Sequence, residues 1–414
     1  MCETQASGLS LPDHTLDRVL TSLPDAFALP AEAYTAPDIF AFEQDMLERH
    51  GWVCVGRADE VAELGAQRAV EVAGEGLLIV RNADDVAVFV NACRHRGHEL
   101  VQRGCSVKRA TVWCAYHAWV YRLDGTLRTA PRFGNLAERD PLGMGLTCVR
   151  SEEWGGFLFV NLSGDAPALS TVVGNLEELL QPYELAGLTR TARHEYDVAA
   201  NWKLLVENYL ECYHCPSTHP ELSKVQRTVH GMDFEESGLW LGGFLDLDNK
   251  ACSMSLDGSG PAWTFPGLDM DRARQVCYHV LLPGLFITAM HDYVVTHRLE
   301  PQAPDRTRVV CEVLFSHDLL AKDTDPAYAS DFWHVTNQQD WRACTSVQRG
   351  MTRSHYRPGP LAIQEEGLHR FLGTMASVYR GRRPLRSLWR APVTAPACSP
   401  VAPPAANVLP RKAR

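Results

Sequence analysis

The sequence predicts an α+β protein in which a small all-β domain precedes a larger domain of helices and strands, and two observations support this. The first is a series of short apolar runs with the length and composition of strands, at residues 76–80, 86–90 and 156–160. Turn-forming residues separate these runs, and the pair Asp124-Gly125 is a strong signal for a two-residue hairpin. We therefore expect the all-β domain between about residues 51 and 162.

The second observation is a change of pattern after residue 199. Up to the 380s, helical periods alternate with strand-like stretches such as residues 276–280 and 308–313, which is typical of an α+β domain. Beyond residue 391, prolines alternate with alanine and other small residues. This composition does not offset the entropy lost on folding, so residues 391–414 are expected to be a disordered tail.

Composition and charge exclude several classes of function. The 414 residues are 45 % hydrophobic and 22 % charged, as in an ordinary soluble globular protein. A net charge of -10 repels a phosphate backbone, so nucleic acid is not an expected partner. No apolar run reaches the roughly 18 residues that cross a bilayer, and the N-terminus has no export signal. We therefore expect a cytoplasmic protein, no membrane partner and reduced thiols for its 13 cysteines.

Two short motifs in the all-β domain each offer one thiolate and one imidazole as metal ligands. These residues are Cys93 and His95 in the first motif and Cys114 and His117 in the second. A structural zinc site is one interpretation, but zinc-binding Cys2His2 units usually pair Cys with Cys and His with His. The mixed arrangement suits a Rieske 2Fe-2S centre, in which two Cys bind one iron and two His the other. His98 and Cys105 lie between the motifs, and we expect both to be structural bystanders.

A second group of candidate ligands lies on residues 201–214, which are predicted to form a helix with Asn201 as its N-cap. Glu207, Glu211 and His214 are spaced i, i+4 and i+7 and would share one face. Large apolar residues cover much of the rest, so we expect a helix buried nearly all round rather than a solvated polar stripe. Buried carboxylates and imidazoles need a charge partner or a metal.

The helix is expected to stop at Pro216, after which the chain folds back and brings His219 to the same point as His214. Two imidazoles and one carboxylate, with the remaining positions open, form the facial triad of non-haem Fe(II) oxygenases. Glu211 is too close to His214 in sequence to be the obvious third ligand. Asp340 lies on the apolar side of a stretch with helical spacing and is preferred, with Asp331 and Glu365 as alternatives.

The Cys/His motifs, C-R-H-R-G and C-x-Y-H-x-W, closely resemble those of the Rieske non-haem iron oxygenases, the alpha subunits of aromatic-ring-hydroxylating dioxygenases and their N-demethylating relatives. Residues 337–340 and 347–350 match the family's N-x-Q-D and V-Q-x-G segments. The resemblance implies that His214, His219 and Asp340 bind a mononuclear iron. It also implies that Glu211 bridges electron transfer between subunits, at a position where many ring dioxygenases have Asp.

The resemblance extends over about residues 34–379 and implies the domain organisation. Residues 1–50 would be an N-terminal arm on the catalytic domain, residues 51–165 the Rieske domain, and residues 166–385 a helix-grip-like catalytic domain with an antiparallel sheet and long helices. Reduction of O2 needs two electrons from outside, and no G-x-G-x-x-G follows a strand. A separate NAD(P)H reductase with flavin and an iron-sulfur cluster, or a ferredoxin, is therefore implied. The family's usual assembly is a homotrimer.

The substrate is less well indicated than the reaction class. Aromatic residues that could surround a methylated ammonium by cation-π attraction lie between the two sets of iron-ligand candidates: Phe234, Trp240, Phe244, Trp263, Phe265, Tyr278, Phe286 and Tyr293. Asp292 is a further candidate for holding a cation, or else a solvated loop charge.

Residues 207–214 and 291–297 resemble stretches of glycine betaine and stachydrine demethylating oxygenases, which favours oxidative N-demethylation of a small quaternary or tertiary amine. Hydroxylation or dihydroxylation of an aromatic ring or other carbon skeleton is the alternative reaction. A Rieske electron carrier and a zinc-stabilised binding protein are the non-enzyme alternatives.

Overall fold

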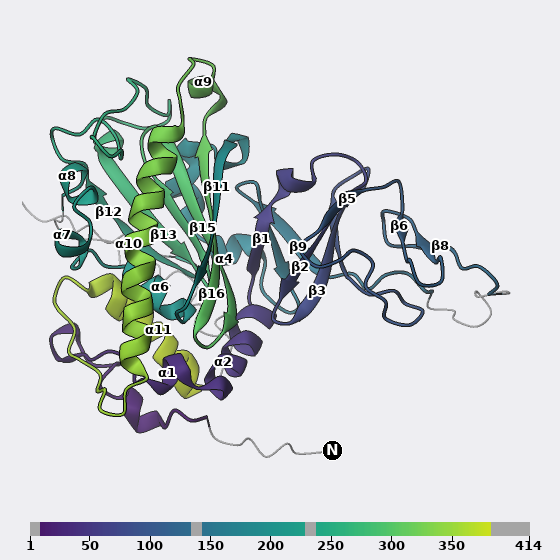
Figure 1. Cartoon of the computed structure of the whole chain (residues 1–414), viewed down its shortest axis with the longest axis horizontal. Helices are drawn as coiled ribbons and strands as arrows, with labels where there is room; N and C mark the ends of the chain where they lie inside the picture. The colour runs from purple at the N-terminus through teal and green to yellow at the C-terminus, as the bar shows by residue number, and fades with distance from the viewer. Residues whose placement is uncertain (1–8, 134–142, 228–236, 382–414) are drawn as a thin grey trace, which may run out of the picture.

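The structure is a computed structural model that describes residues 9–133, 143–227 and 237–381. A smaller domain of β-sheets lies beside a larger domain of one broad sheet and long helices (Figure 1), so the predicted α+β class is confirmed. The expected disordered tail at residues 391–414 lies outside the described residues. Within the described ranges, no helix is both long and apolar enough to cross a membrane.

The smaller domain contains three antiparallel sheets of short strands. Their strand orders are β1 (Val53–Arg57), β10 (Phe157–Asn161), β9 (Arg150–Trp154); β4 (Val86–Val90), β3 (Glu75–Arg81), β2 (Ala66–Val72), β5 (Ser106–Lys108); and β6 (Val112–Trp113), β7 (Val120–Tyr121), β8 (Leu127–Thr129). The three predicted strand runs are confirmed as β3, β4 and β10. Gly125 makes the turn between β7 and β8 with φ +83°, and a Cβ there would lie 2.4 Å from the ring of Phe89.

The larger domain is built on a six-stranded antiparallel sheet. Its strand order is β11 (Thr189–Val198), β16 (Arg306–Phe315), β15 (Tyr293–Ala303), β14 (Leu285–Ala289), β13 (Gln275–Leu281), β12 (Trp240–Asp246). The central strands are rich in β-branched residues and buried on both faces. One face packs against the long helix α10 (Ala327–Met351), which crosses it in Figure 1. The other packs against α4 (Leu169–Val173), α5 (Leu176–Leu180) and strands of the smaller domain.

The remaining elements are shorter or terminal. The helices are α1 (Glu32–Thr35), α2 (Pro37–Glu43), α6 (Trp202–Tyr209), α7 (Cys215–Thr218), α8 (Leu222–Val225), α9 (His317–Leu320) and α11 (Glu366–Gly381). Single turns are η1 (Asp13–Leu16), η2 (Leu23–Asp25), η3 (Gln44–Arg49), η4 (Ala58–Val61), η5 (Gln181–Tyr183), η6 (Leu185–Gly187) and η7 (Arg272–Arg274).

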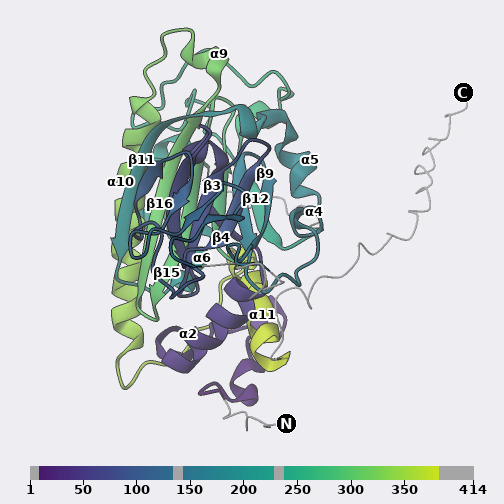
Figure 2. The same cartoon turned by 90° about the vertical axis from the view of Figure 1, so that its right-hand side faces the viewer.

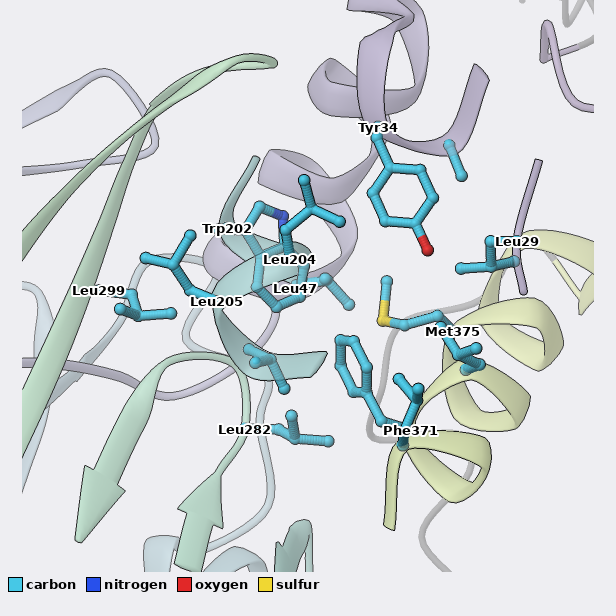
Figure 3. Close-up of a cluster of buried hydrophobic side chains, with 14 of the residues drawn as sticks. Leu29, Tyr34, Leu47, Trp202, Leu204, Leu205, Leu282, Leu299, Phe371 and Met375 are labelled. Carbon is cyan, nitrogen blue, oxygen red and sulfur yellow. The ribbon is translucent and has the colours of Figure 1, made fainter. Parts of the chain in front are cut away.

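The N-terminal segment packs at the same end of the larger domain as α11 (Figure 2). Its side chains Tyr34 and Leu47 share one apolar cluster with Trp202 of α6 and Met375 of α11 (Figure 3). At the edge of this cluster the buried Lys203 ammonium donates to the Glu43 carboxylate at 2.6 Å. These contacts fix the start of α6, and thereby the chain that leaves its C-terminal end.

The predicted helix over residues 201–214 is wrong at its C-terminal end. Asn201 caps α6 as expected, accepting from the Lys203 amide at 3.0 Å, but the helix ends at Tyr209. The Glu211 carboxylate accepts from the amides of Tyr213 and His214 at 2.5 and 3.2 Å. A continued helix would give those amides to carbonyls one turn earlier, so the side chain replaces the helical partner.

Two further expectations are wrong because α6 ends at Tyr209. Pro216 lies in the first turn of α7 rather than stopping a helix, a position where proline's missing N–H costs nothing. Glu207 does not share a face with Glu211 and His214; its carboxylate accepts instead from the Tyr34 hydroxyl at 2.7 Å.

The expectation of reduced thiols is wrong for one pair. Cys212 and Cys215 form a disulfide, with Cα atoms 5.0 Å apart, because the turn after α6 folds back and the Cys215 amide donates to the Cys212 carbonyl at 3.2 Å. The other cysteines among the described residues are free.

Candidate metal centres

The two Cys/His motifs form a matched pair of loops at the outer end of the smaller domain. In the first loop the amide of Cys93 donates to the carbonyl of His98 at 2.8 Å, and in the second the amide of Cys114 donates to the carbonyl of Trp119 at 2.8 Å. Each motif is therefore closed by the same kind of turn. This closure directs both pairs of side chains toward one another although they come from separate arms of the chain.

The side chains of these loops have the donor set of a 2Fe-2S site. The Cys93 and Cys114 thiols are buried, and the rings of His95 and His117 lie 4.5 Å apart between centroids in an edge-on arrangement. The Nδ1 atoms of both histidines are buried without a hydrogen-bond partner. Buried polar atoms need partners, and two thiols with two orphaned imidazole nitrogens fit a cluster with mixed Cys and His ligands. The Tyr121 hydroxyl lies 3.2 Å from the Cys93 sulfur and adds a polar contact.

His98 and Cys105, the two expected structural bystanders, do not belong to this group of Cys and His donors. His98 is exposed, with Nδ1 2.6 Å from the carbonyl oxygen of Glu99. Cys105 is exposed and lies beside β5.

The second donor group forms where the turn after α6 meets the middle of α10. His214 precedes α7, His219 follows it, and Asp340 projects from α10. Asp340 Oδ1 lies 3.4 Å from His214 Nε2 and 2.9 Å from His219 Nε2, and the two Nε2 atoms are 3.1 Å apart. Neither Asp331 nor Glu365 has a contact with these imidazoles among the described interactions. The donor set fits a three-ligand iron site.

The outer nitrogens of both imidazoles are held by other side chains. His214 Nδ1 lies 2.5 Å from Glu211 Oε1, and His219 Nδ1 lies 2.7 Å from Gln339 Oε1. These contacts leave both Nε2 atoms facing Asp340. Burial lowers the pKa of His214, but hydrogen bonds to Asp340 and Glu211 outweigh it and raise the pKa to about 9. The carboxylates thus stabilise positive charge at this point, whether carried by a proton or a metal.

Other side chains approach the group without completing it. Asn208 Nδ2 lies 3.3 Å from His214 Nε2. The Cys215 sulfur lies within 4.8 Å of donor nitrogens of His214 and His219, but its bond to Cys212 removes it as a thiolate ligand.

A cavity of about 800 Å³ opens beside this group and has a wall of aromatic rings. The aromatic residues that line it are Tyr209, Tyr213, Phe244, Tyr278, Phe286, Trp333 and Trp341. Tyr209 stacks on Phe286 at 4.4 Å and meets Tyr278 edge-on at 5.6 Å. Tyr278 is paired across the sheet with Gly243, which has no side chain to compete for this space.

The aromatic residues singled out from the sequence divide into two sets. Phe244, Tyr278 and Phe286 line the cavity, whereas the others described belong to the core: Trp240, Trp263, Phe265 and Tyr293. Phe234 lies outside the described residues. Tyr209, Tyr213, Trp333 and Trp341 also line the cavity and were not among the aromatic residues predicted from the sequence. The signal for the two tryptophans was available, because Trp333, Asn337 and Trp341 are spaced i, i+4 and i+8 on the face of α10 that carries Asp340.

Asp292 is neither a cavity residue nor a solvated loop charge. It is fully buried and accepts hydrogen bonds from Ser253 and Tyr328, both at 2.7 Å. Burial raises the pKa of its carboxyl.

Comparison with known proteins agrees with this geometry. Residues 51–140 match the family of the Rieske [2Fe-2S] domain, and residues 185–381 match the ring hydroxylating alpha subunit (catalytic domain). The glycine betaine monooxygenase oxygenase subunit of Chromohalobacter salexigens is 30% identical over 368 residues, covering 80% of this chain and 81% of that protein. The carnitine monooxygenase oxygenase subunit of Escherichia coli K12 is 29% identical over 392 residues, covering 89% and 98%.

Solved structures show the same relationship. A quaternary ammonium Rieske monooxygenase in complex with an inhibitor superposes with a TM-score of 0.74 at 25% identity, covering 89% of this chain and 99% of that one. Naphthalene 1,2-dioxygenase from Rhodococcus sp. shares the fold, with a TM-score of 0.70 at 17% identity over 90% and 99% of the two chains. With both motif-bearing domains matched and most of each relative covered, this chain belongs to the Rieske oxygenase alpha subunits, which combine a Rieske 2Fe-2S domain with a catalytic non-haem iron domain.

Proposed function

We propose that this chain is the oxygenase subunit of a monooxygenase that removes a methyl group from a small quaternary or tertiary amine. The observation that carries this proposal is the aromatic wall of the cavity directly beside His214, His219 and Asp340. Aromatic faces attract organic cations. The relatives named above act on glycine betaine and carnitine, as their names state, and their matches cover 80% and 89% of this chain.

The charges of the cavity also favour a cation. Glu211, Asp340 and Glu366 line it, and its described lining contains neither Lys nor Arg. His297 lines the floor from β15, and burial lowers its pKa to about 4, so its ring is neutral. Away from the proposed iron ligands, a positively charged amine therefore meets aromatic faces and the Glu366 carboxylate.

The metal ligands are part of the same proposal. His214, His219 and Asp340 would hold the mononuclear iron, and Cys93, His95, Cys114 and His117 the cluster. When bound, the iron activates O2 and the cluster supplies one of the electrons. The aromatic wall and the proposed iron ligands line one cavity, so an amine held by the rings would lie beside the iron.

The overall reaction balances for a quaternary amine. One oxygen atom of O2 enters a methyl C–H bond, and the other leaves as water with two external electrons and two protons. The N-hydroxymethyl product then releases formaldehyde and a proton, leaving a tertiary amine.

Electron supply requires partners. The strands β6 and β8 that flank the second Cys/His loop lie on the opposite side of the molecule from α7 (Figure 1). This separation favours electron transfer from the cluster of a neighbouring subunit in a homotrimer. Glu211, whose carboxylate bonds His214 at 2.5 Å, would bridge the two subunits. The first electron donor would be a separate NAD(P)H reductase with flavin and an iron-sulfur cluster, directly or through a ferredoxin.

A single-turnover assay tests the reaction without the reductase. The protein is reduced chemically without air, mixed with O2 and a panel of N-methylated amines and aromatic acids, and the products are analysed by mass spectrometry. Loss of one methyl group with an equal amount of formaldehyde is expected. A ring product heavier by one or two oxygen atoms would overturn the demethylase proposal.

Two substitutions on one helix test the ligand assignment. Asp340→Asn should abolish turnover and iron binding while the visible spectrum of the cluster stays, because an amide is a poor ligand for Fe(II). Asp331→Asn, an exposed change on α10, is the matched control and should retain both. Full turnover by the Asp340 variant would show that another carboxylate binds the iron.

A further inference from the structure

We infer that Gln339 and Glu221 act together as positioning residues for His219, and this inference rests on the proposed iron ligands. The Gln339 amide oxygen lies 2.7 Å from His219 Nδ1, and its amide nitrogen donates to Glu221 Oε2 at 2.9 Å. The three groups form a relay from a carboxylate, through an amide, to an imidazole.

The relay has only one consistent direction. An ionised carboxylate can only accept, so Glu221 must receive the Gln339 NH2 group and leave the amide oxygen facing His219. His219 Nδ1 must then carry the proton and donate it. Its Nε2 atom keeps a lone pair, directed to the point that it shares with Asp340.

The two histidines are thus oriented by different means. His214 Nδ1 contacts the Glu211 carboxylate directly at 2.5 Å. His219 Nδ1 contacts the Gln339 amide oxygen, and the nitrogen of the same amide donates to the Glu221 carboxylate. Histidine ligands commonly donate their second nitrogen to such partners, and the partner fixes the ring and raises its basicity. His219 is 1% exposed, so in the intact site its Nδ1 proton is donated to Gln339 rather than to solvent.

The relay also joins the two segments that carry the iron ligands. Glu221 follows His219 by two residues, and Gln339 precedes Asp340 on α10, so one side chain ties the turn after α7 to the helix. Gln338 provides a matched comparison: it is exposed on the same helix and lies 3.1 Å from His334 Nε2, away from the iron ligands.

The test measures Fe(II) affinity rather than turnover. Gln339→Ala and Gln338→Ala are purified without iron, loaded, and titrated against a Fe(II) chelator, with the cluster spectrum and thermal unfolding as checks of the fold. We expect Gln339→Ala to bind Fe(II) about 10- to 100-fold more weakly, and Gln338→Ala to match the unchanged protein. The EPR line shape of the Fe(II)–nitric oxide complex should change only in the Gln339 variant.

A swap of the two partners separates positioning from simple loss of packing. Gln339→Glu keeps an acceptor for His219 Nδ1 but places its carboxylate against that of Glu221, and this repulsion opposes the position that holds the ring. Adding Glu221→Gln restores a donor facing an acceptor, because the new amide at 221 can donate to the carboxylate at 339. The double variant should therefore bind Fe(II) more tightly than Gln339→Glu alone.

Two outcomes contradict the inference. The inference is wrong if the Gln339→Ala and Gln338→Ala variants bind Fe(II) with equal affinity. It is also wrong if adding Glu221→Gln to Gln339→Glu does not increase the affinity for Fe(II). His219→Ala distinguishes this failure from failure of the ligand assignment. If the His219→Ala variant still binds iron, the proposed ligands are wrong. If His219→Ala loses iron but Gln339→Ala keeps it, only the relay is wrong.

Discussion

Replacing Tyr209 with leucine tests whether the aromatic wall recognises the charge of the substrate or only its shape. One face of the Tyr209 ring is covered by Phe286, with centroids 4.4 Å apart, and Tyr278 meets its edge at 5.6 Å. These rings pack on each other, so a cation in the cavity meets a single face of Tyr209. One cation-π contact contributes about 0.5–2 kcal/mol. Tyr209→Leu should therefore weaken cation binding by about 2- to 30-fold.

The assay compares two ligands of nearly equal shape. Choline and its neutral carbon isostere 3,3-dimethylbutan-1-ol are titrated calorimetrically into iron-loaded protein. We expect the unchanged protein to bind choline more tightly than the neutral alcohol. In Tyr209→Leu, the ratio of the two affinities should fall by about 2- to 30-fold. Tyr209→Phe is the control, because it keeps the ring and removes only the hydroxyl, which lies 2.7 Å from Thr288 Oγ1. Equal losses for both ligands in the leucine variant would refute recognition of charge by this ring.

Three further predictions follow from particular contacts. Glu211→Gln should keep iron but slow oxidation of the reduced cluster by at least about 10-fold, as measured by stopped-flow absorbance with substrate and O2; an unchanged rate would exclude Glu211 as the bridge. Burial raises the pKa of Glu207 from 4.5 to about 8. At a pH between these two values, the Glu207 carboxyl is protonated in the folded protein and ionised in the unfolded chain. Stability should fall as pH rises from about 4.5 to 8, at most by about 1.4 kcal/mol per pKa unit, and Glu207→Gln should reduce that slope in urea unfolding at pH 5 and 8. Gly125→Ala should destabilise the smaller domain by at least about 1 kcal/mol, because φ is +83° and the Cβ would meet Phe89 at 2.4 Å; thermal unfolding measures this, and an unchanged midpoint would contradict it.

The parts of the site that the sequence predicts are those encoded within a few residues of one another. Cys93 and His95 lie in one turn and Cys114 and His117 in another, so local spacing defines the donors. Asp340 was found because helical spacing places it on the inner face of α10, and the helix is confirmed. The family resemblance then supplied the roles that spacing alone left open.

The parts that escaped prediction depend on contacts between distant residues. The apolar pattern of residues 201–214 continues past Tyr209, so periodicity alone extends the helix too far. The Glu211 side chain competes for the amides of Tyr213 and His214, and nothing in the pattern shows this competition. Gln339 was equally invisible, because its partners His219 and Glu221 lie 120 and 118 residues away.

The proposed iron ligands come from two segments of unequal rigidity, and this difference predicts how the site fails. Asp340 lies in the middle of the 25-residue helix α10, which packs along the sheet. His214 and His219 lie in a short turn held by the Glu211 carboxylate, the Cys212–Cys215 disulfide and the Gln339 amide. Because that turn contains only the four-residue helix α7 and depends on these side-chain contacts, loosening it costs the fold less than unfolding α10. Substitutions in the turn should therefore release iron well below the unfolding temperature, whereas disrupting the buried face of α10 should lose iron and the fold together.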